Sequence, residues 1–85
     1  MPLSTSSAAY GIMTGILLDL RHSRGLTQGQ LAARLGKPQA FVSNVETGAR
    51  RIDVIEFCVI ARVLGADPVS LFAEIAHHLP DRIDI

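Results

Sequence analysis

The chain has 85 residues, of which 48% are hydrophobic, so we expect one domain with a modest core and no second, catalytic or ligand-sensing domain. Its formal net charge is zero, which argues against a partner bound through a large basic surplus. The single cysteine, Cys58, excludes an intrachain disulfide, and its apolar neighbours favour a packing role. Residues 8–18 are uncharged, but they lack the basic flank and cleavage site of a signal peptide and are too few to span a bilayer. We therefore predict a soluble, cytoplasmic domain without a membrane partner.

The charges are distributed unevenly along the chain. Residues 20–51 hold six basic side chains and one acidic one, which makes this segment +5. Residues 52–85 hold two basic and six acidic side chains, or −4, and Asp19 supplies the remaining −1. A neutral chain with one basic end can still direct that end toward phosphate groups.

Five helices are predicted from apolar spacing and from residues that begin or end helices. The first covers residues 7–23, where apolar side chains recur at helical spacing. The second follows Thr27, an N-cap whose reciprocal partner is Gln30, and ends at Gly36. The buried side chains of this second helix are expected to be Leu31, Ala32 and Leu35.

The third helix is predicted to begin at Pro38, since proline suits the first turn of a helix, and to end before Gly48. The fourth is expected over residues 53–65 and the fifth over residues 67–79, each after an aspartate that can cap it. The side chains expected to point inward are Phe41, Val42 and Val45 in the third helix, Ile55, Val59, Ile60 and Val63 in the fourth, and Leu71, Phe72, Ile75 and Leu79 in the fifth.

The predicted fold class is all-α, because no alternating pattern longer than residues 82–85 suggests a strand. We expect a compact five-helix domain over residues 7–79, with a flexible lead-in over residues 1–6 and a short tail over residues 80–85. The chain has no glycine-rich phosphate loop and no nucleophile in a catalytic motif, so no enzyme is expected. His77 and His78 are adjacent on a helix and point about 100° apart, so neither a metal site nor a cofactor is expected.

The second and third helices are joined by a few residues around Gly36, and we expect them to cross steeply as a helix-turn-helix. The outward face of the third helix then carries a short, uncharged set: Gln39, Ala40, Ser43 and Asn44. Such amides can bond adenine at N6 and N7, and an alanine methyl can contact thymine. An ordinary solvated face is the alternative, which composition alone does not exclude. Base recognition is favoured by the phosphate-seeking residues on either side, which are Lys37, Arg50 and Arg51.

These helices resemble the helix-turn-helix of lambda-repressor-like, XRE-type (Cro/CI) regulators, over about residues 10–79. The matching residues are Arg21, Gly25-Leu26-Thr27-Gln28, Leu31-Ala32, Leu35-Gly36, Val42-Ser43-Asn44-Val45-Glu46 and Gly48, followed by Arg51-Ile52-Asp53-Val54-Ile55-Glu56-Phe57 and Ala61-Arg62-Val63-Leu64-Gly65. The spacing of so many residues is more specific than any single short motif. The resemblance implies a small transcriptional regulator, with repression as its expected mode, that binds the major groove of double-stranded DNA.

The resemblance also implies roles for single residues. Gln28 would bond a phosphate and brace Gln39, and the base contacts would come from Gln39, Ala40 and Asn44, with Ser43 as a secondary candidate. Arg21 would pair with Glu46 in a structural salt bridge, and Thr47 and the amide of Gly48 would approach the sugar-phosphate chain. The sequence departs from many relatives at Pro38, where they carry a Ser or Thr hydroxyl, and its basic surplus is modest. Both departures predict moderate affinity per monomer, so that useful binding requires a dimer.

The fifth helix and the tail carry more apolar side chains than one side of so small a domain normally covers: Leu71, Phe72, Ile75, Leu79 and Ile83. They could close the core of the monomer, but we favour a two-fold dimer through these residues, as in small members of the family. The predicted function is a homodimeric regulator at the nucleoid, bound to a palindromic operator with half-sites about 34 Å apart. The alternative is an antitoxin or interaction module that binds a toxin or another protein through the fifth helix.

Overall fold

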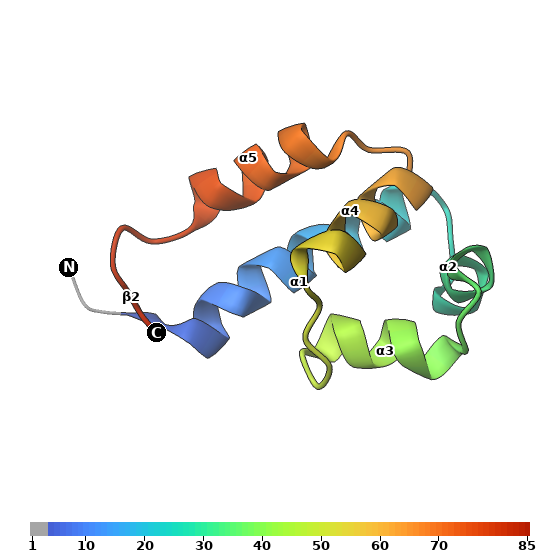
Figure 1. Ribbon diagram of the computed structural model, residues 1–85, viewed down its shortest axis with the longest axis horizontal. Coiled ribbons are helices and arrows are strands. Elements are labelled where there is room, and N and C mark those ends of the chain that lie inside the picture. The colour runs from blue at the N-terminus through green and yellow to red at the C-terminus, as the bar shows by residue number, and fades with distance from the viewer. Residues whose placement is uncertain (1–3) are drawn as a thin grey trace.

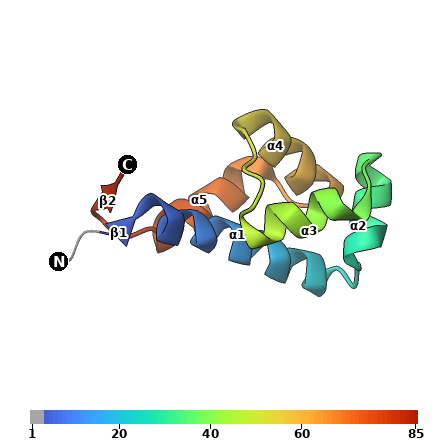
Figure 2. The same ribbon diagram turned by 90° about the horizontal axis from the view of Figure 1, so that it is seen from below.

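The computed structural model describes residues 4–85, and its main elements are five helices (Figure 1). In chain order the elements are β1 (Ser4–Thr5), α1 (Ser6–Ser23), α2 (Gln28–Leu35), α3 (Gln39–Thr47), α4 (Val54–Val63), α5 (Pro68–His78) and β2 (Ile83–Asp84). The predicted all-α class is confirmed. Helices α2 and α3 lie at the end of the molecule away from both termini (Figures 1 and 2). Among residues 4–85, none of the helices has the length and apolar character that crossing a membrane requires.

The helix starts follow from local caps. Thr27 Oγ1 accepts from the amide of Gln30 at 3.1 Å, and Gln30 Oε1 accepts from the amide of Thr27 at 2.9 Å. Asp53 and Glu56 form the same reciprocal pair in front of α4. Helix α3 begins one residue later than predicted, because Pro38 has φ −70° and ψ 157° and is the N-cap. A proline φ fits both positions, and only the extended ψ places Pro38 outside the helix.

The core lies between α1, α4 and α5 and extends under α2 and α3. Its buried members are Leu17, Leu31, Ala32, Val42, Phe57, Ile60, Ala61, Leu64, Leu71 and Ile75. The prediction that Ile55 and Val59 point inward was wrong, since they are 72% and 47% exposed. Helix α4 buries a different stripe, Phe57, Ile60 and Ala61, which Leu64 continues directly after the helix, and Ile55 lies on the other side of the helix from Phe57. Cys58, expected to be buried, is half-buried.

The two ends of the chain pair with each other. β1 and β2 run parallel, with Ser4 opposite Ile83 and Thr5 opposite Asp84. The sequence predicted a flexible lead-in over residues 1–6; residues 1–3 lie outside the described part of the chain, but residues 4–5 form this strand and Ser6 begins α1. Pairing between opposite ends of a chain depends on α1 and α5 lying alongside each other, which no local pattern reveals.

Candidate nucleic-acid interface

A tight turn sets the angle between α2 and α3. Gly36 has a φ of 68°, in the left-handed region where a side chain is strained. Its amide donates to the carbonyl of Ala33 at 3.1 Å, and the amide of Lys37 donates to the carbonyl of Ala32 at 2.9 Å. The reversal packs α3 against α2 through Val42 and Ala32, which are 3% and 1% exposed. Because Ala32 is small, the two backbones can approach closely.

Helix α3 exposes the side chains that the sequence assigned to DNA bases. Gln39, Ala40 and Asn44 are exposed, and Ser43 is half-buried. The opposite side of the helix is fixed in the core by Val42 and Val45. The outward strip is therefore uncharged, short and held by a rigid element, and its amides and methyl group are of the kind that can contact base edges in the major groove.

Arg21 and Glu46 form a buried ion pair behind this strip. Arg21 Nε lies 2.6 Å from Glu46 Oε2, and Arg21 Nη2 donates to Glu46 Oε1 at 3.0 Å. The remaining terminal nitrogen, Nη1, donates to the carbonyl of Leu26 at 2.8 Å. Their side chains are only 7% and 6% exposed. This geometry joins the end of α1 to the end of α3 and fits the structural role that the resemblance implied.

Gln28, at the start of α2, connects the ion pair to the exposed strip. Its Nε2 donates to Glu46 Oε1 at 2.9 Å, and its Oε1 accepts from Gln39 Nε2 at 3.5 Å. The resemblance implied the contact with Gln39 but not the one with Glu46. Three side chains from two helices thus form one continuous hydrogen-bonded chain that ends at an exposed amide.

The ionisation of Glu46 follows from its surroundings. Burial acts to raise the pKa of Glu46, but the hydrogen bonds from Arg21 and Gln28, together with the charge of Arg21, hold this pKa below its ordinary value. The carboxylate is therefore ionised at neutral pH, and as an anion it can only accept hydrogen bonds.

His22, which was not predicted to belong to this site, contacts Arg21. Its Nε2 lies 3.2 Å from Arg21 Nη2, and because a guanidinium can only donate, the imidazole nitrogen accepts in this contact. The side chain borders an open surface hollow, whose lining residues are Arg21, His22, Gly25, Leu26, Thr27, Gln28, Gly29 and Gln39. The hollow leads from the start of α2 to the start of α3, beside the exposed strip. No pattern in the sequence indicated this position of His22, since its place beside the hollow depends on where α1 ends relative to α2.

The three basic residues predicted to contact phosphate have different environments. Arg50 pairs with Glu56 through Nη2 at 2.9 Å and stacks over the ring of Phe41. Arg51 stacks over Tyr10 of α1, and Lys37 lies 5.6 Å from the centre of the Phe41 ring. All three are exposed, but Arg50 already has partners for its terminal nitrogens.

The end of α3 is closed by its own hydrogen bonds. Thr47 Oγ1 donates to the carbonyl of Asn44 at 3.2 Å and accepts from the amide of Ala49 at 3.4 Å. The amide of Gly48, expected to face the sugar-phosphate chain, donates to the carbonyl of Val45 at 3.1 Å. Thr47 remains exposed, whereas the Gly48 amide is engaged within the turn.

The residues predicted to form a dimer interface are divided between the core and the surface. Leu71 and Ile75 are buried in the core of the monomer, which leaves little of either side chain available to a partner. Leu79 and Ile83 are half-buried, and Phe72 is 62% exposed. The exposed apolar face of α5 is instead a stripe at helical spacing, consisting of Val69, Phe72, Ala73 and Ala76. His77 and His78, at the end of α5, are also exposed. Among residues 4–85, no three side chains of the kinds that bind metal ions lie close enough together to form a metal site.

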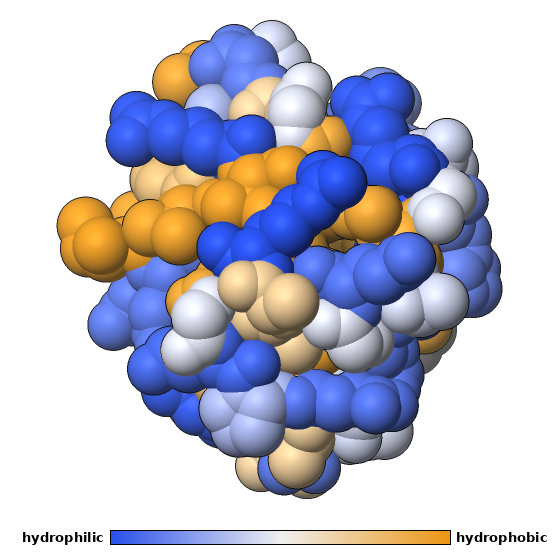
Figure 3. Space-filling model, turned by 90° about the vertical axis from the view of Figure 1, so that its right-hand side faces the viewer, coloured by the Kyte–Doolittle hydropathy of each residue, from blue (hydrophilic) through white to orange (hydrophobic). Residues whose placement is uncertain are grey.

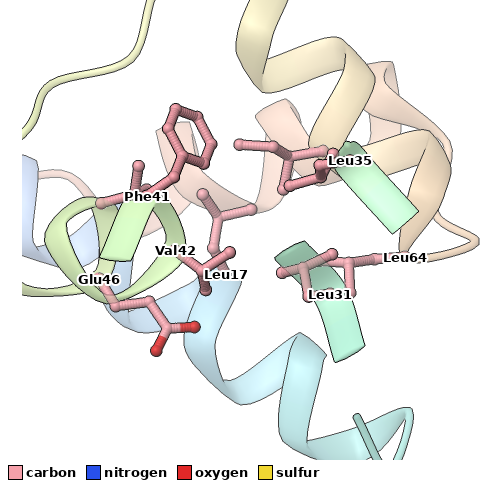
Figure 4. A pocket seen from close by; sticks show the side chains of 9 residues that line it. Leu17, Leu31, Leu35, Phe41, Val42, Glu46 and Leu64 are labelled. Atoms are coloured by element: carbon pink, nitrogen blue, oxygen red, sulfur yellow. The ribbon is translucent and has the colours of Figure 1, made fainter. Parts of the chain in front are cut away.

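Two hollows near the helix-turn-helix are lined mainly by apolar side chains. A cavity of about 20 Å³ beneath it is lined by apolar side chains, with Glu46 at its edge (Figure 4). A second hollow, between α2, α3 and α4, is lined by Leu35, Lys37, Phe41, Ile55, Glu56, Val59 and Ile60. The end of the molecule near α2 also carries a band of hydrophobic residues bordered by hydrophilic ones (Figure 3). The cavity of about 20 Å³ is too small for a ligand, and the second hollow is lined mainly by apolar side chains. The exposed strip of α3 is therefore the better candidate for binding nucleic acid.

Comparisons with known proteins agree with this geometry. A family model described as a helix-turn-helix domain matches residues 16–74, which include all of α2, α3 and α4. An uncharacterised HTH-type transcriptional regulator from Sinorhizobium fredii is 40% identical over 52 residues, or 61% of this chain and 68% of that relative. The solved structure of an XRE-family like protein from Pseudomonas syringae pv. tomato has a TM-score of 0.80 and 44% identity, covering 87% of this chain and 90% of that one.

Proposed function

The chain belongs to the XRE-type helix-turn-helix family of DNA-binding transcription regulators, and from this premise we propose that it is a homodimeric repressor that recognises a palindromic operator through the major groove. The observation that carries the proposal is the exposed, uncharged strip of α3, which is fixed from behind by the chain of hydrogen bonds from Glu46 through Gln28 to Gln39. A base-contacting helix needs such support, because a side chain that is free to rotate loses entropy when it bonds a base.

Base contacts are assigned to the start and middle of α3. Gln39 and Asn44 present amides that suit adenine, and Ala40 presents a methyl group that suits thymine. Ser43, which is half-buried, has a hydroxyl that can bond several bases and is a secondary contact. With Val42 and Val45 anchoring the helix, these contacts would be made without moving the backbone.

Phosphate contacts are assigned to the residues that border the strip. Lys37 stands before α3 and Arg51 after it, and both are exposed. Gln28 borders the open hollow and keeps one amide hydrogen beyond its bond to Glu46, so it would also reach a phosphate. These residues lie in the segment of the chain that carries +5, which would direct this end toward DNA.

A second copy would pair through the outward face of α5. Val69 and Phe72 are 77% and 62% exposed, and Ala73 and Ala76 complete a stripe on which another helix could approach closely. Two α5 helices that cross antiparallel about Phe72 would place Asp67, at the start of one, near His78, at the end of the other. This interface differs from the one predicted from sequence by excluding Leu71 and Ile75.

Selection of bound sequences from random double-stranded DNA tests the proposal. The purified chain should enrich a palindrome with half-sites about 34 Å apart, one turn of the duplex. Its affinity should fall steeply as salt rises, because phosphate contacts release counterions. A failure to enrich any sequence at low salt would overturn the proposal, and enrichment of a single half-site would overturn the dimer.

A second candidate function is binding of a partner protein such as a toxin. Its support is the apolar surface of α4 around Ile55 and Val59, which are 72% and 47% exposed and border a hollow that contains no residue of α5. Purification from native lysate would distinguish the two functions. A stoichiometric protein partner would support this second function, and a homodimer alone would argue against it.

A further inference from the structure

In the series of hydrogen bonds behind α3, each donor points toward Glu46: Gln39 donates to Gln28, and Gln28 donates to Glu46. The carboxylate is ionised and can only accept, while Arg21 can only donate. Arg21 takes both carboxylate oxygens through Nε and Nη2, which holds the carboxylate in one orientation. Whatever bonds Glu46 Oε1 from the side of α2 must therefore offer a hydrogen.

Gln28 is the residue in that position, and its amide has two different ends. The NH2 end donates to Glu46 Oε1 at 2.9 Å. Turning the amide around would set the carbonyl oxygen of Gln28 against a carboxylate oxygen, which is repulsive because both atoms are acceptors and no hydrogen lies between them. Glu46 therefore fixes Gln28 with its Oε1 directed toward α3.

The orientation of Gln28 fixes which end of the Gln39 amide faces it. Because Gln28 presents an acceptor, Gln39 has to donate, and its Nε2 lies 3.5 Å from Gln28 Oε1. One hydrogen of Gln39 is used in this contact, which leaves the second hydrogen and the Oε1 atom for another partner. A donor beside an acceptor is the pattern that pairs with N7 and N6 of adenine.

The opposite direction would present a different pattern. If Gln28 donated to Gln39 Oε1, the NH2 group of Gln39 would face outward with its hydrogens. Donors alone match guanine, whose major-groove edge has two acceptors, N7 and O6. The choice between adenine and guanine at this base pair thus depends on which way the chain of amides runs.

We propose that Glu46 is a positioning residue that sets the hydrogen-bonding direction of Gln28 and Gln39, and so makes Gln39 prefer adenine over guanine. The inference rests on the proposed function, since it requires that Gln39 meets a base. It gives the Arg21–Glu46 pair a second role beside joining α1 to α3. Glu46 itself touches no base and acts through Gln28.

Gln28→Lys tests the inference without breaking the ion pair. A lysine at this position offers donors only, so it can still bond Glu46 but would donate to Gln39 Oε1 and turn that amide around. The base pair that Gln39 contacts is first identified as the one whose preference is lost in Gln39→Ala. At that pair, Gln28→Lys should change the preference from adenine to guanine, by about tenfold in relative affinity.

Glu46→Gln provides the second variant. A neutral amide can donate or accept, so Gln28 is free to take either direction, and the preference for adenine over guanine should shrink toward equality at that pair alone. Ile75→Val is the matched control, because it weakens the core on α5 without touching the network, and it should leave the base preference unchanged. Thermal melting of each variant shows that the domain is folded. If Glu46→Gln unfolds, Gln28→Lys still tests whether the group that residue 28 presents to Gln39 sets the base preference.

The possible results separate this inference from the proposed function. If the wild-type chain enriches no sequence, the proposed function fails. If it enriches a palindrome but prefers guanine at the Gln39 pair, or if Gln28→Lys keeps the preference for adenine, the inference fails while the proposed function stands. A changed preference in Gln28→Lys with unchanged preferences at the other pairs supports both.

Discussion

The guanidinium of Arg50 lies 4.7 Å from the centre of the Phe41 ring and donates to both carboxylate oxygens of Glu56. These contacts join α3 to the start of α4 across the connecting loop. The next residue, Arg51, turns the other way and lies 4.4 Å over the ring of Tyr10 on α1. Tyr10 also accepts a hydrogen bond from the amide of Ile52. Two adjacent arginines that look equivalent in the sequence thus hold the loop to different helices.

This division predicts different effects on DNA binding. In Arg51→Ala the dependence of log affinity on log salt should become shallower by about one, because the terminal nitrogens of Arg51 are free to meet a phosphate. In Arg50→Ala this slope should stay nearly unchanged, while the melting temperature falls because the loop loses its contacts with Phe41 and Glu56. Titrations at several salt concentrations measure the slope. The interpretation is wrong if the Arg50 variant loses as much slope as the Arg51 variant.

The buried ion pair predicts a strong asymmetry between single and double substitutions. Arg21→Met alone leaves Glu46 as an unpaired buried charge and should lower the free energy of unfolding by about 3 to 5 kcal/mol. The double variant Arg21→Met with Glu46→Leu removes both charges and should recover much of this loss. Urea denaturation at neutral pH measures both. Equal destabilisation of the single and double variants would show that packing, and not the unpaired charge, dominates.

The lowered pKa of Glu46 predicts a pH-dependent stability. The pKa of Glu46 is lower in the folded chain than its ordinary value of 4.5, so the unfolded chain takes up a proton at a higher pH than the folded chain does. The ionised carboxylate therefore stabilises the fold fully above its ordinary pKa, and this stabilisation is lost as the pH falls. The free energy of unfolding should therefore fall as pH drops from about 5 and should keep falling through the folded pKa. Urea denaturation across this range should show a shallower fall in Glu46→Gln.

Other acids contribute in the same range. The pKa of Glu56 is lowered by its bond to Arg50 and that of Asp67 by its bonds to Ser70. Glu56 is half-buried and Asp67 is exposed, so solvent screens both groups more than it screens Glu46. Glu56→Gln is thus the comparison variant, and it should change the acid dependence less than Glu46→Gln does. A larger effect at Glu56 would contradict the assignment to the buried pair.

The exposed stripe of α5 predicts the oligomeric state of variants. Phe72→Glu should convert the proposed dimer to a monomer, because it places a charge in the apolar stripe, while the fold persists because the side chain lies outside the core. Binding to a palindrome should weaken by a hundredfold or more if avidity from two linked contacts is lost. Sedimentation and DNA titration measure the two effects.

The control for this prediction is Glu74→Gln, an exposed position of α5 outside the stripe. It should change neither the mass in solution nor the affinity for the palindrome. A Phe72→Glu chain that remains a dimer would place the interface elsewhere, with the apolar surface around Ile55 as the next candidate.

Features that depend on neighbours three or four residues apart could be predicted from the sequence. The caps at Thr27 and Asp53 were predictable because both partners of each bond lie within one helical turn. The turn at Gly36 was predictable because glycine adopts a positive φ without strain. The exposed strip on α3 followed from the same periodicity, once Val42 and Val45 had been assigned to the core.

Features that depend on residues from different helices could be seen only once the helices were packed together. Ile55 and Phe72 looked like core residues because each is apolar at a helical spacing, but a helix with apolar residues on more than one side buries only the side that meets a neighbour. Local patterns also left the separate partners of Arg50 and Arg51 undetermined. Above all, the sequence showed Gln28, Gln39 and Glu46 as three separate polar residues. Only the packing of α2 against α3 makes them a single hydrogen-bonded chain, because a hydrogen bond acts over about 3 Å and its direction depends on what each partner can donate or accept.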